Sequence, residues 1–351
     1  MKDAARGGGE VYLRENVSNV VKCPSRRICF PTRARSDQLH NAATTISFRH
    51  LTIPYIVIPF SVVFLLWDRL ANNSQITQNL PDSPEVFLAF AVFFGYPHIM
   101  ASTVLLSTRD YFAALQWPLI GCALAALVFA FVTPLIWGVD GLIKMFLVAT
   151  VYHVIAQQTG IAKIGLRLDP LTLRLWFVWK WSGVLVALAA IGMIYQGLHW
   201  SVMGSVFFVM LVSGLLLSRS AKDKKAALYL FANVSLLTAV GFAAIVQSPF
   251  FVVLMPRLVH DINAFTFYCF HDLSRARSSH SGPFFIKKPL SKTLAVFVTP
   301  IAAIVLAFPL TYFFESSAVA TFAIAFAFFH YLTEYFVWKR GSPLRTHLTA
   351  A

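Results

Sequence analysis

The chain has 351 residues, of which 58% are hydrophobic and only 13% are charged, and its mean hydropathy is +0.67. This composition excludes an ordinary soluble globular protein. Apolar runs of about 20 residues, the length of a membrane-spanning helix, recur from position 50 onward, and the alternating segments of a membrane β-barrel are absent. We therefore expect an all-α fold, a polytopic membrane helix bundle.

Ten apolar segments are long enough to be spans. They cover residues 50–67, 86–107, 113–137, 141–163, 175–196, 200–218, 226–246, 249–271, 293–313 and 317–338. Residues 1–45 are polar and contain several Gly and Arg, which predicts a disordered cytoplasmic tail. Residues 46–340 are then the transmembrane bundle, and residues 341–351 a cytoplasmic C-terminal tail.

The net charge of +14 is distributed unevenly along the chain. Most Lys and Arg lie in the two tails and in the loops after the even-numbered spans, so the positive-inside rule places both termini in the cytoplasm. The basic excess is therefore topological and suits contact with anionic membrane lipids rather than nucleic acid. We expect an integral, multi-pass protein of a bacterial inner membrane.

Spans two, four, eight and ten run in the same direction, and each carries a histidine well inside the membrane. These histidines are His98, His153, His260 and His330. Each lies about eight to eleven residues from the cytoplasmic end of its span, a spread of about one helical turn. The sequence therefore predicts one layer of four imidazoles, although a single histidine in a membrane commonly bridges two helices by a hydrogen bond.

Two polar residues follow these histidines at helical spacing. Glu334 comes four residues after His330, and Gln157 four residues after His153, so each pair shares a helix face. Both are candidate catalytic residues, which would accept a ring N–H and fix the metal-binding tautomer. Glu334 is also a candidate direct ligand.

The eighth span carries more ionisable residues than its neighbours. Arg257 and Asp261 are four residues apart and can form an ion pair, and His271 lies three turns beyond His260. If this helix ends near residue 271, His271 lies at the cytoplasmic mouth. If the helix extends to about residue 278, His271 sinks deeper and could replace His260 as the inner ligand.

Neutral imidazoles that converge inside a helix bundle make a site for a first-row transition metal. Fe(II) is favoured because positions remain open for O₂, while copper and zinc also accept imidazole. Two other interpretations are a haem held between facing histidines and a transporter in which histidine and acidic residues carry protons or ions.

The segment "GYPHIMAS" around His98 resembles the Pro-His-Gly helix of the Brp/Blh family of membrane β-carotene 15,15′-dioxygenases. "FTFYCFHDLSRAR" is similar to a later helix of that family, in which an aromatic run precedes a His-Ser-x-x-His-like motif, and His153 stands at the place of the family's His-Phe-Gly histidine. The resemblance implies a non-haem iron site with His98, His153 and His271 as ligands, and cleavage of a carotenoid by O₂. The departures from the family motifs are Ile99, Val154, Ile155 and Arg275.

The sequence as a whole predicts a membrane-embedded oxygenase with a non-haem iron site. Its partners would be O₂ and an apolar, lipid-like or isoprenoid substrate that enters from the bilayer, with carotenoid cleavage and lipid hydroxylation or desaturation as the candidate reactions. A haem protein and a proton- or ion-coupled transporter are the alternatives.

Overall fold

The computed structural model describes residues 44–277, 292–312, 317–339, 342 and 348–350. The tail expected at residues 1–45 lies outside the described residues except for its last two positions. Of the tail expected at residues 341–351, only residue 342 and residues 348–350 are described.

The described chain is helical apart from two strands of three residues each. The elements are β1 (Thr44–Ile46), α2 (Phe48–Thr52), η1 (Ile53–Ile56), α3 (Val57–Ala71), α4 (Gln75–Gln78), η2 (Pro84–Val86), α5 (Leu88–Phe90), η3 (Ala91–Gly95), α6 (Tyr96–Leu106), α7 (Arg109–Ile164), α8 (Pro170–Tyr195), α9 (Trp200–Ser218), α10 (Lys224–Ile245), α11 (Pro249–Arg277), α12 (Lys292–Tyr312), α13 (Ser317–Trp338) and β2 (Leu348–Ala350). The expected all-α helix bundle is confirmed.

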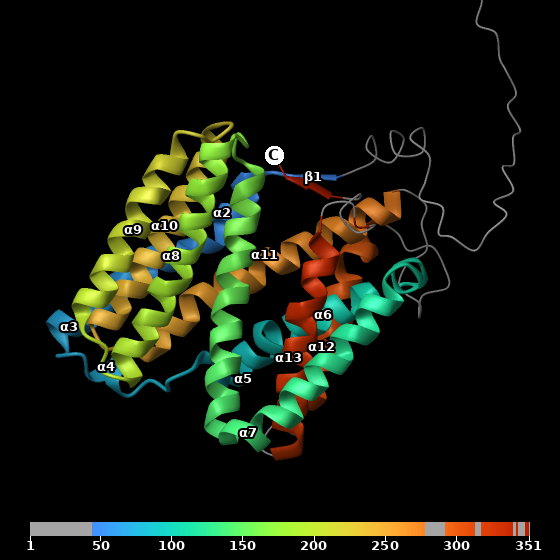
Figure 1. Cartoon of the computed structure of the whole chain (residues 1–351), viewed down its shortest axis with the longest axis horizontal. Helices are drawn as coiled ribbons and strands as arrows, with labels where there is room; N and C mark the ends of the chain where they lie inside the picture. Colours follow the sequence, from blue (N-terminus) through green and yellow to red (C-terminus); the bar gives the residue numbers. More distant parts are fainter. Residues whose placement is uncertain (1–43, 278–291, 313–316, 340–341, 343–347, 351) are drawn as a thin grey trace, which may run out of the picture. The chain divides into compact units, whose positions relative to one another are not determined.

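Eight helices within the described residues are long and apolar enough to cross a membrane. One of them, in α7, contains two of the expected spans, because Gly138 leaves the helical conformation with φ 70° and reverses the chain direction (Figure 1). A shorter apolar stretch, Val296–Pro309, lies in α12. With the halves of α7 counted separately and α12 included, all ten expected spans have a helix, and the protein is an integral, multi-pass membrane protein.

Capping residues fix where several of these helices begin. Asp169 accepts a hydrogen bond from the Thr172 amide in front of α8, and Asp223 accepts one from the Ala226 amide in front of α10. The first turn of a helix has unpaired N–H groups, and Asp satisfies them well. Asp169 is followed by Pro170, a residue preferred at the first helical position. These polar caps separate one apolar span from the next.

The buried apolar side chains form two clusters on either side of α11. The larger cluster joins α3, α8, α9, α10 and the second half of α7 with the start of α11. The smaller one joins α6, α12, α13 and the first half of α7 with the later part of α11. Figure 1 shows α11 (orange) crossing between the two groups of helices. Its ionisable residues therefore face protein on several sides, the condition under which a membrane helix tolerates them.

The second expected span, residues 86–107, is not one regular helix. It begins with a 3₁₀ turn (η2) and a single turn of α-helix (α5), continues as the π-helix η3, and becomes regular only in α6. π-helical turns occur frequently at functional sites, because the extra residue changes the direction of the side chains that follow. Here η3 ends at Gly95, three residues before His98.

The first and last described segments pair with each other. β1 and β2 form a two-stranded parallel sheet in which Thr44 lies opposite Leu348 and Ile46 opposite Ala350. Ile46 is fully buried and belongs to the larger apolar cluster. The pair thus connects segments from the two ends of the described chain.

Candidate metal centre

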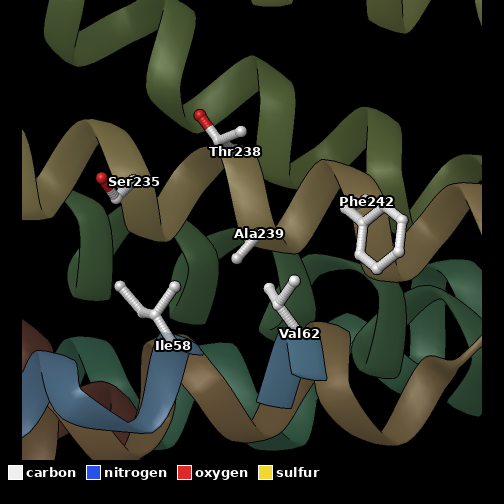
Figure 2. Close-up of a pocket in the computed structure, with 6 residues that line it drawn as sticks. All are labelled: Ile58, Val62, Ser235, Thr238, Ala239 and Phe242. Carbon is white, nitrogen blue, oxygen red and sulfur yellow. The ribbon is translucent and has the colours of Figure 1, made fainter. Parts of the chain in front are cut away.

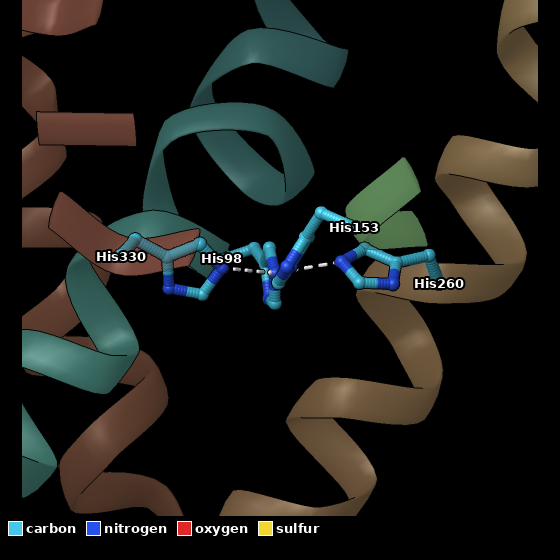
Figure 3. A group of neighbouring side chains, drawn as sticks. All are labelled: His98, His153, His260 and His330. Atoms are coloured by element: carbon cyan, nitrogen blue, oxygen red, sulfur yellow. Dashed lines mark hydrogen bonds between the residues drawn. The ribbon is translucent and has the colours of Figure 1, made fainter. Parts of the chain in front are cut away.

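Four histidines from four helices meet in the interior of the bundle. His98 comes from α6, His153 from the second half of α7, His260 from α11 and His330 from α13, and Figure 3 shows their side chains converging. One ligand nitrogen from each lies within 4.8 Å of the ligand nitrogens of the other three, and all four residues are buried. We call these four residues the histidine group. The structure thus brings together the four residues that the sequence places in one layer.

The spacing of the ring nitrogens is that of ligands on one ion. His98 Nε2 lies 2.9 Å from His260 Nε2 and 3.1 Å from His330 Nε2 (Figure 3). A metal–imidazole bond is about 2.1 Å long, so two nitrogens on one ion lie about 3.0 Å apart at right angles and about 3.4 Å apart at the tetrahedral angle. The two observed separations are compatible with ligands on one ion and are also those of hydrogen bonds between imidazoles, which the dashed lines of Figure 3 mark.

The Ser102 hydroxyl lies between two partners, the Ile99 carbonyl at 2.9 Å and His330 Nδ1 at 2.8 Å. When the hydroxyl donates to the carbonyl, its oxygen accepts from His330 Nδ1–H. With the proton on Nδ1, the Nε2 atom of His330 presents a lone pair to the group. Ser102 is four residues after His98 but supports the histidine of another helix.

Glu334 and Gln157, the two predicted catalytic residues, lie at the edge of the histidine group and bind each other. Gln157 Nε2 donates to Glu334 Oε2 over 2.9 Å, and the same oxygen lies 3.8 Å from His153 Nε2. The Tyr268 hydroxyl donates to Glu334 Oε1 over 2.7 Å. The structure therefore places the Glu334 carboxylate beside His153, where it is held by two neutral donors.

Aromatic side chains enclose the histidine group. The ring of Tyr331 stacks on His153 with centroids 4.3 Å apart, and its hydroxyl is hydrogen-bonded to Thr150 Oγ1 at 2.9 Å. Tyr268 stacks on His98 at 6.4 Å. Such contacts fix ring orientation, and they surround the imidazole nitrogens with apolar groups. Tyr268 and Tyr331 are not indicated by the sequence, because no spacing rule connects residues on different helices.

His271, the competing ligand in the sequence, lies in a separate polar cluster. Its Nε2 atom is 2.7 Å from the Tyr111 hydroxyl, and its Nδ1 atom is 3.4 Å from Asp272 Oδ1. Asp272 also accepts from the Thr299 hydroxyl over 2.5 Å. Although α11 extends to Arg277, as the longer alternative required, it is His260 that lies in the histidine group.

An open groove lies between α3 and α10, away from the histidine group. Its volume is about 370 Å³, and its walls are apolar except for the hydroxyls of Ser235 and Thr238 (Figure 2). None of its lining residues belongs to the histidine group or contacts Glu334 by a hydrogen bond. It is therefore a separate feature of the larger apolar cluster.

A scan of protein-family models and searches of curated proteins and solved structures found no match to this chain.

Proposed function

We propose that the protein is a membrane-embedded, metal-dependent oxygenase that uses non-haem iron and acts on an apolar, lipid-like or isoprenoid substrate. The observation that carries the proposal is the convergence of four buried histidines from four helices within the spacing of metal ligands. A single buried histidine is commonly a hydrogen-bond bridge between helices, but four imidazoles that face one point repel each other's lone pairs unless a cation or protons lie between them.

The need for open coordination positions favours iron over zinc. Four imidazoles on a six-coordinate ion leave two positions open. A tetrahedral zinc ion would be saturated by four histidines and could only be structural. A bound Fe(II) ion would activate O₂ at the coordination positions that the histidines leave open.

The surrounding residues suit oxygen chemistry on an apolar substrate. Burial of all four histidines excludes bulk water, which limits the escape of reactive oxygen species. Gln157 donates to the Glu334 carboxylate, which lies 3.8 Å from His153 Nε2 and can accept or deliver a proton there. The substrate enters laterally from the bilayer, in our proposal that of a bacterial inner membrane. The Brp/Blh resemblance supplies carotenoid cleavage as one candidate reaction, and lipid hydroxylation or desaturation is the other.

Haem binding fits this site poorly, because a haem iron takes one or two axial protein ligands and not four. Ion-coupled transport is the second candidate, and one observation favours it. Arg257 and Asp261 are buried in the middle of α11, with side chains 3.9 Å apart, and ionisable groups at such depth commonly mark ion pathways. A transporter would contain no stoichiometric transition metal and would show substrate flux driven by a proton or sodium gradient.

Metal analysis of the detergent-purified protein, together with its absorption spectrum, tests the proposal. We expect iron in a stoichiometric amount and no Soret band, and we expect O₂ consumption when a carotenoid or an unsaturated lipid is added. The His271→Ala variant is the matched control, because His271 is a buried histidine of the same helix outside the histidine group. Protein without bound metal, or with zinc alone, would contradict the iron oxygenase.

A further inference from the structure

The carboxylate of Asp261 is next to the histidine group in sequence and is fully buried. It follows His260 on α11, and neither of its oxygens accepts a hydrogen bond from the described residues. Its charged neighbour is Arg257, whose Nε atom is 3.9 Å away. A buried carboxylate without hydrogen bonds is costly in a membrane, so its presence at this depth calls for a compensating positive charge.

Arg257 does not compensate Asp261 alone. Its Nε atom also lies 3.7 Å from Glu85 Oε1, so one guanidinium is shared between two carboxylates. The side chain lies beside η3, because a Cβ at Gly95 would be 4.0 Å from Arg257 Nη2. Gly95 comes three residues before His98, so the guanidinium lies about one turn from the start of the segment that carries this histidine.

Glu334 adds a third carboxylate, on another side of the histidine group. Its hydrogen-bond donors are the Tyr268 hydroxyl and the Gln157 amide. Both donors are neutral, so they orient the carboxylate and stabilise it but do not cancel its charge. The flanking ionisable side chains are thus the buried Asp261, Glu334 and Arg257, together with the partly exposed Glu85 that pairs with Arg257.

When ionised, these flanking groups sum to two negative charges, and neutral imidazoles add none. A divalent cation held by the histidine group cancels that charge. A monovalent cation would leave one negative charge in the interior, and a trivalent cation would leave one positive charge. Because uncompensated charge is strongly disfavoured at membrane depth, the arrangement selects among ions by charge.

We propose that Glu85, Arg257, Asp261 and Glu334 balance the histidine group for one divalent cation, and that Asp261 is a specificity-determining residue for that charge. The inference rests on the proposed function, in that it requires the histidine group to hold a metal. It goes beyond that function by assigning a role to Arg257 and Asp261, neither of which offers a ligand atom to the group.

Charge-balancing variants test the inference by metal binding, without an activity assay. Full-length protein is stripped of metal with a chelator in detergent and titrated with Fe(II) and Zn(II) as divalent probes and Cu(I) as the monovalent probe. Asp261→Asn should weaken divalent binding about 10- to 100-fold, the usual effect of losing a residue that supports a metal site. It should not weaken Cu(I) binding, because the remaining single negative charge matches a monovalent ion. The double variant Arg257→Gln/Asp261→Asn restores the original charge sum and should bring divalent binding back to within a few fold of wild type.

Asp272→Asn is the matched control. Asp272 is a carboxylate residue on the same helix as Asp261, but it lies in the His271 cluster. This variant should bind divalent ions like wild type. If Asp261→Asn does not assemble, Arg257→Gln replaces it in the comparison. That variant leaves a sum of three negative charges, of which a divalent ion cancels only two, so it should bind divalent ions more weakly than the double variant.

Two outcomes would contradict the inference in different ways. Wild-type divalent affinity in Asp261→Asn, or a double variant that binds more weakly than Asp261→Asn, would leave Arg257 and Asp261 as a structural ion pair and overturn only the charge balance. A wild-type protein that binds none of the probe ions would overturn the proposed function, and the charge balance with it.

Discussion

Gln157 and Gln158 are neighbours on α7, yet their side chains form hydrogen bonds with different groups of helices. Gln157 Nε2 donates to Glu334 on α13 over 2.9 Å, beside the histidine group. Gln158 Oε1 accepts from the Tyr55 hydroxyl at 2.9 Å and from the Tyr229 hydroxyl at 2.6 Å, within the larger apolar cluster. Consecutive residues of one helix therefore connect the surroundings of the histidine group with the larger apolar cluster.

This division of roles predicts different effects for two similar substitutions. Gln157→Leu removes a donor to Glu334 and should weaken metal binding about 10-fold while leaving thermal stability nearly unchanged. Gln158→Leu leaves two buried phenols without their acceptor and should destabilise the protein by about 1–3 kcal/mol per unsatisfied group. Metal content and thermal unfolding in detergent measure the two effects, and an exchange of the two outcomes would contradict the assignment.

Replacement of histidines distinguishes the histidine group from the His271 cluster. His98→Ala, or the same change at His153, His260 or His330, should lose most of the metal while the bundle stays assembled. A side-chain hydrogen bond between membrane helices contributes only about 0.6 kcal/mol, so loss of one such bond cannot unfold the protein. His271→Ala should keep its metal. Full occupancy in three of the four single variants would exclude a shared site.

The cap of α8 predicts a pH-dependent contribution to stability. Hydrogen bonds from the Thr172 hydroxyl and amide lower the pKa of the Asp169 carboxyl below its ordinary value. Because the folded-state pKa is the lower one, the contribution is fully present above the unfolded pKa of about 3.9 and disappears as pH falls through the folded pKa.

Asp169→Ala should therefore unfold at a lower temperature than wild type at neutral pH, and the difference should shrink at about pH 3. Asp169→Asn is the control, because an amide oxygen caps a helix without a charge and should give a stability with little pH dependence. A difference between wild type and Asp169→Ala that stays constant across this range would show that the carboxylate form makes no special contribution.

Two glycines of α9 differ in the room that they leave for a side chain. A Cβ at Gly214 would lie 2.7 Å from Val234 Cγ2 and 3.0 Å from Trp179 Nε1, whereas a Cβ at Gly204 would meet nothing within 4 Å. Gly214→Ala should therefore destabilise the protein by about 1–3 kcal/mol through overpacking between α8, α9 and α10. Gly204→Ala should be neutral or stabilise by up to about 1 kcal/mol. Thermal unfolding of both variants checks this, and equal effects would argue against close packing at Gly214.

The depth of each histidine could be predicted from sequence, because it depends only on helical rise and on the direction of each span. That is why His98, His153, His260 and His330 appear in one layer before any contact is known. The shared face of His330 and Glu334 follows equally from helical spacing. Local geometry thus gives the height of a residue and its face on its own helix.

What local geometry cannot give is the partner across a helix interface. Ser102 shares a face with His98, yet its hydroxyl is hydrogen-bonded to His330 of α13. Similarly, α11 is as long as the alternative that favoured His271 required, but packing against α7 brings His271 to Tyr111 instead. The π-helix η3 could not be predicted from the sequence either, because one extra residue in a turn does not change the apolar pattern recognisably.

The parallel pairing of β1 with β2 bears on how the chain is synthesised and modified. Thr44 precedes every span, whereas its partner Leu348 follows them all, so this contact has nearly the greatest sequence separation that the described residues allow. Contacts of such separation form late, because the cost of closing a long loop must be met first. During translation β1 therefore remains without its partner strand until β2, which follows the last span, has been synthesised. A bulky insertion placed directly after β2 would interfere with this final step.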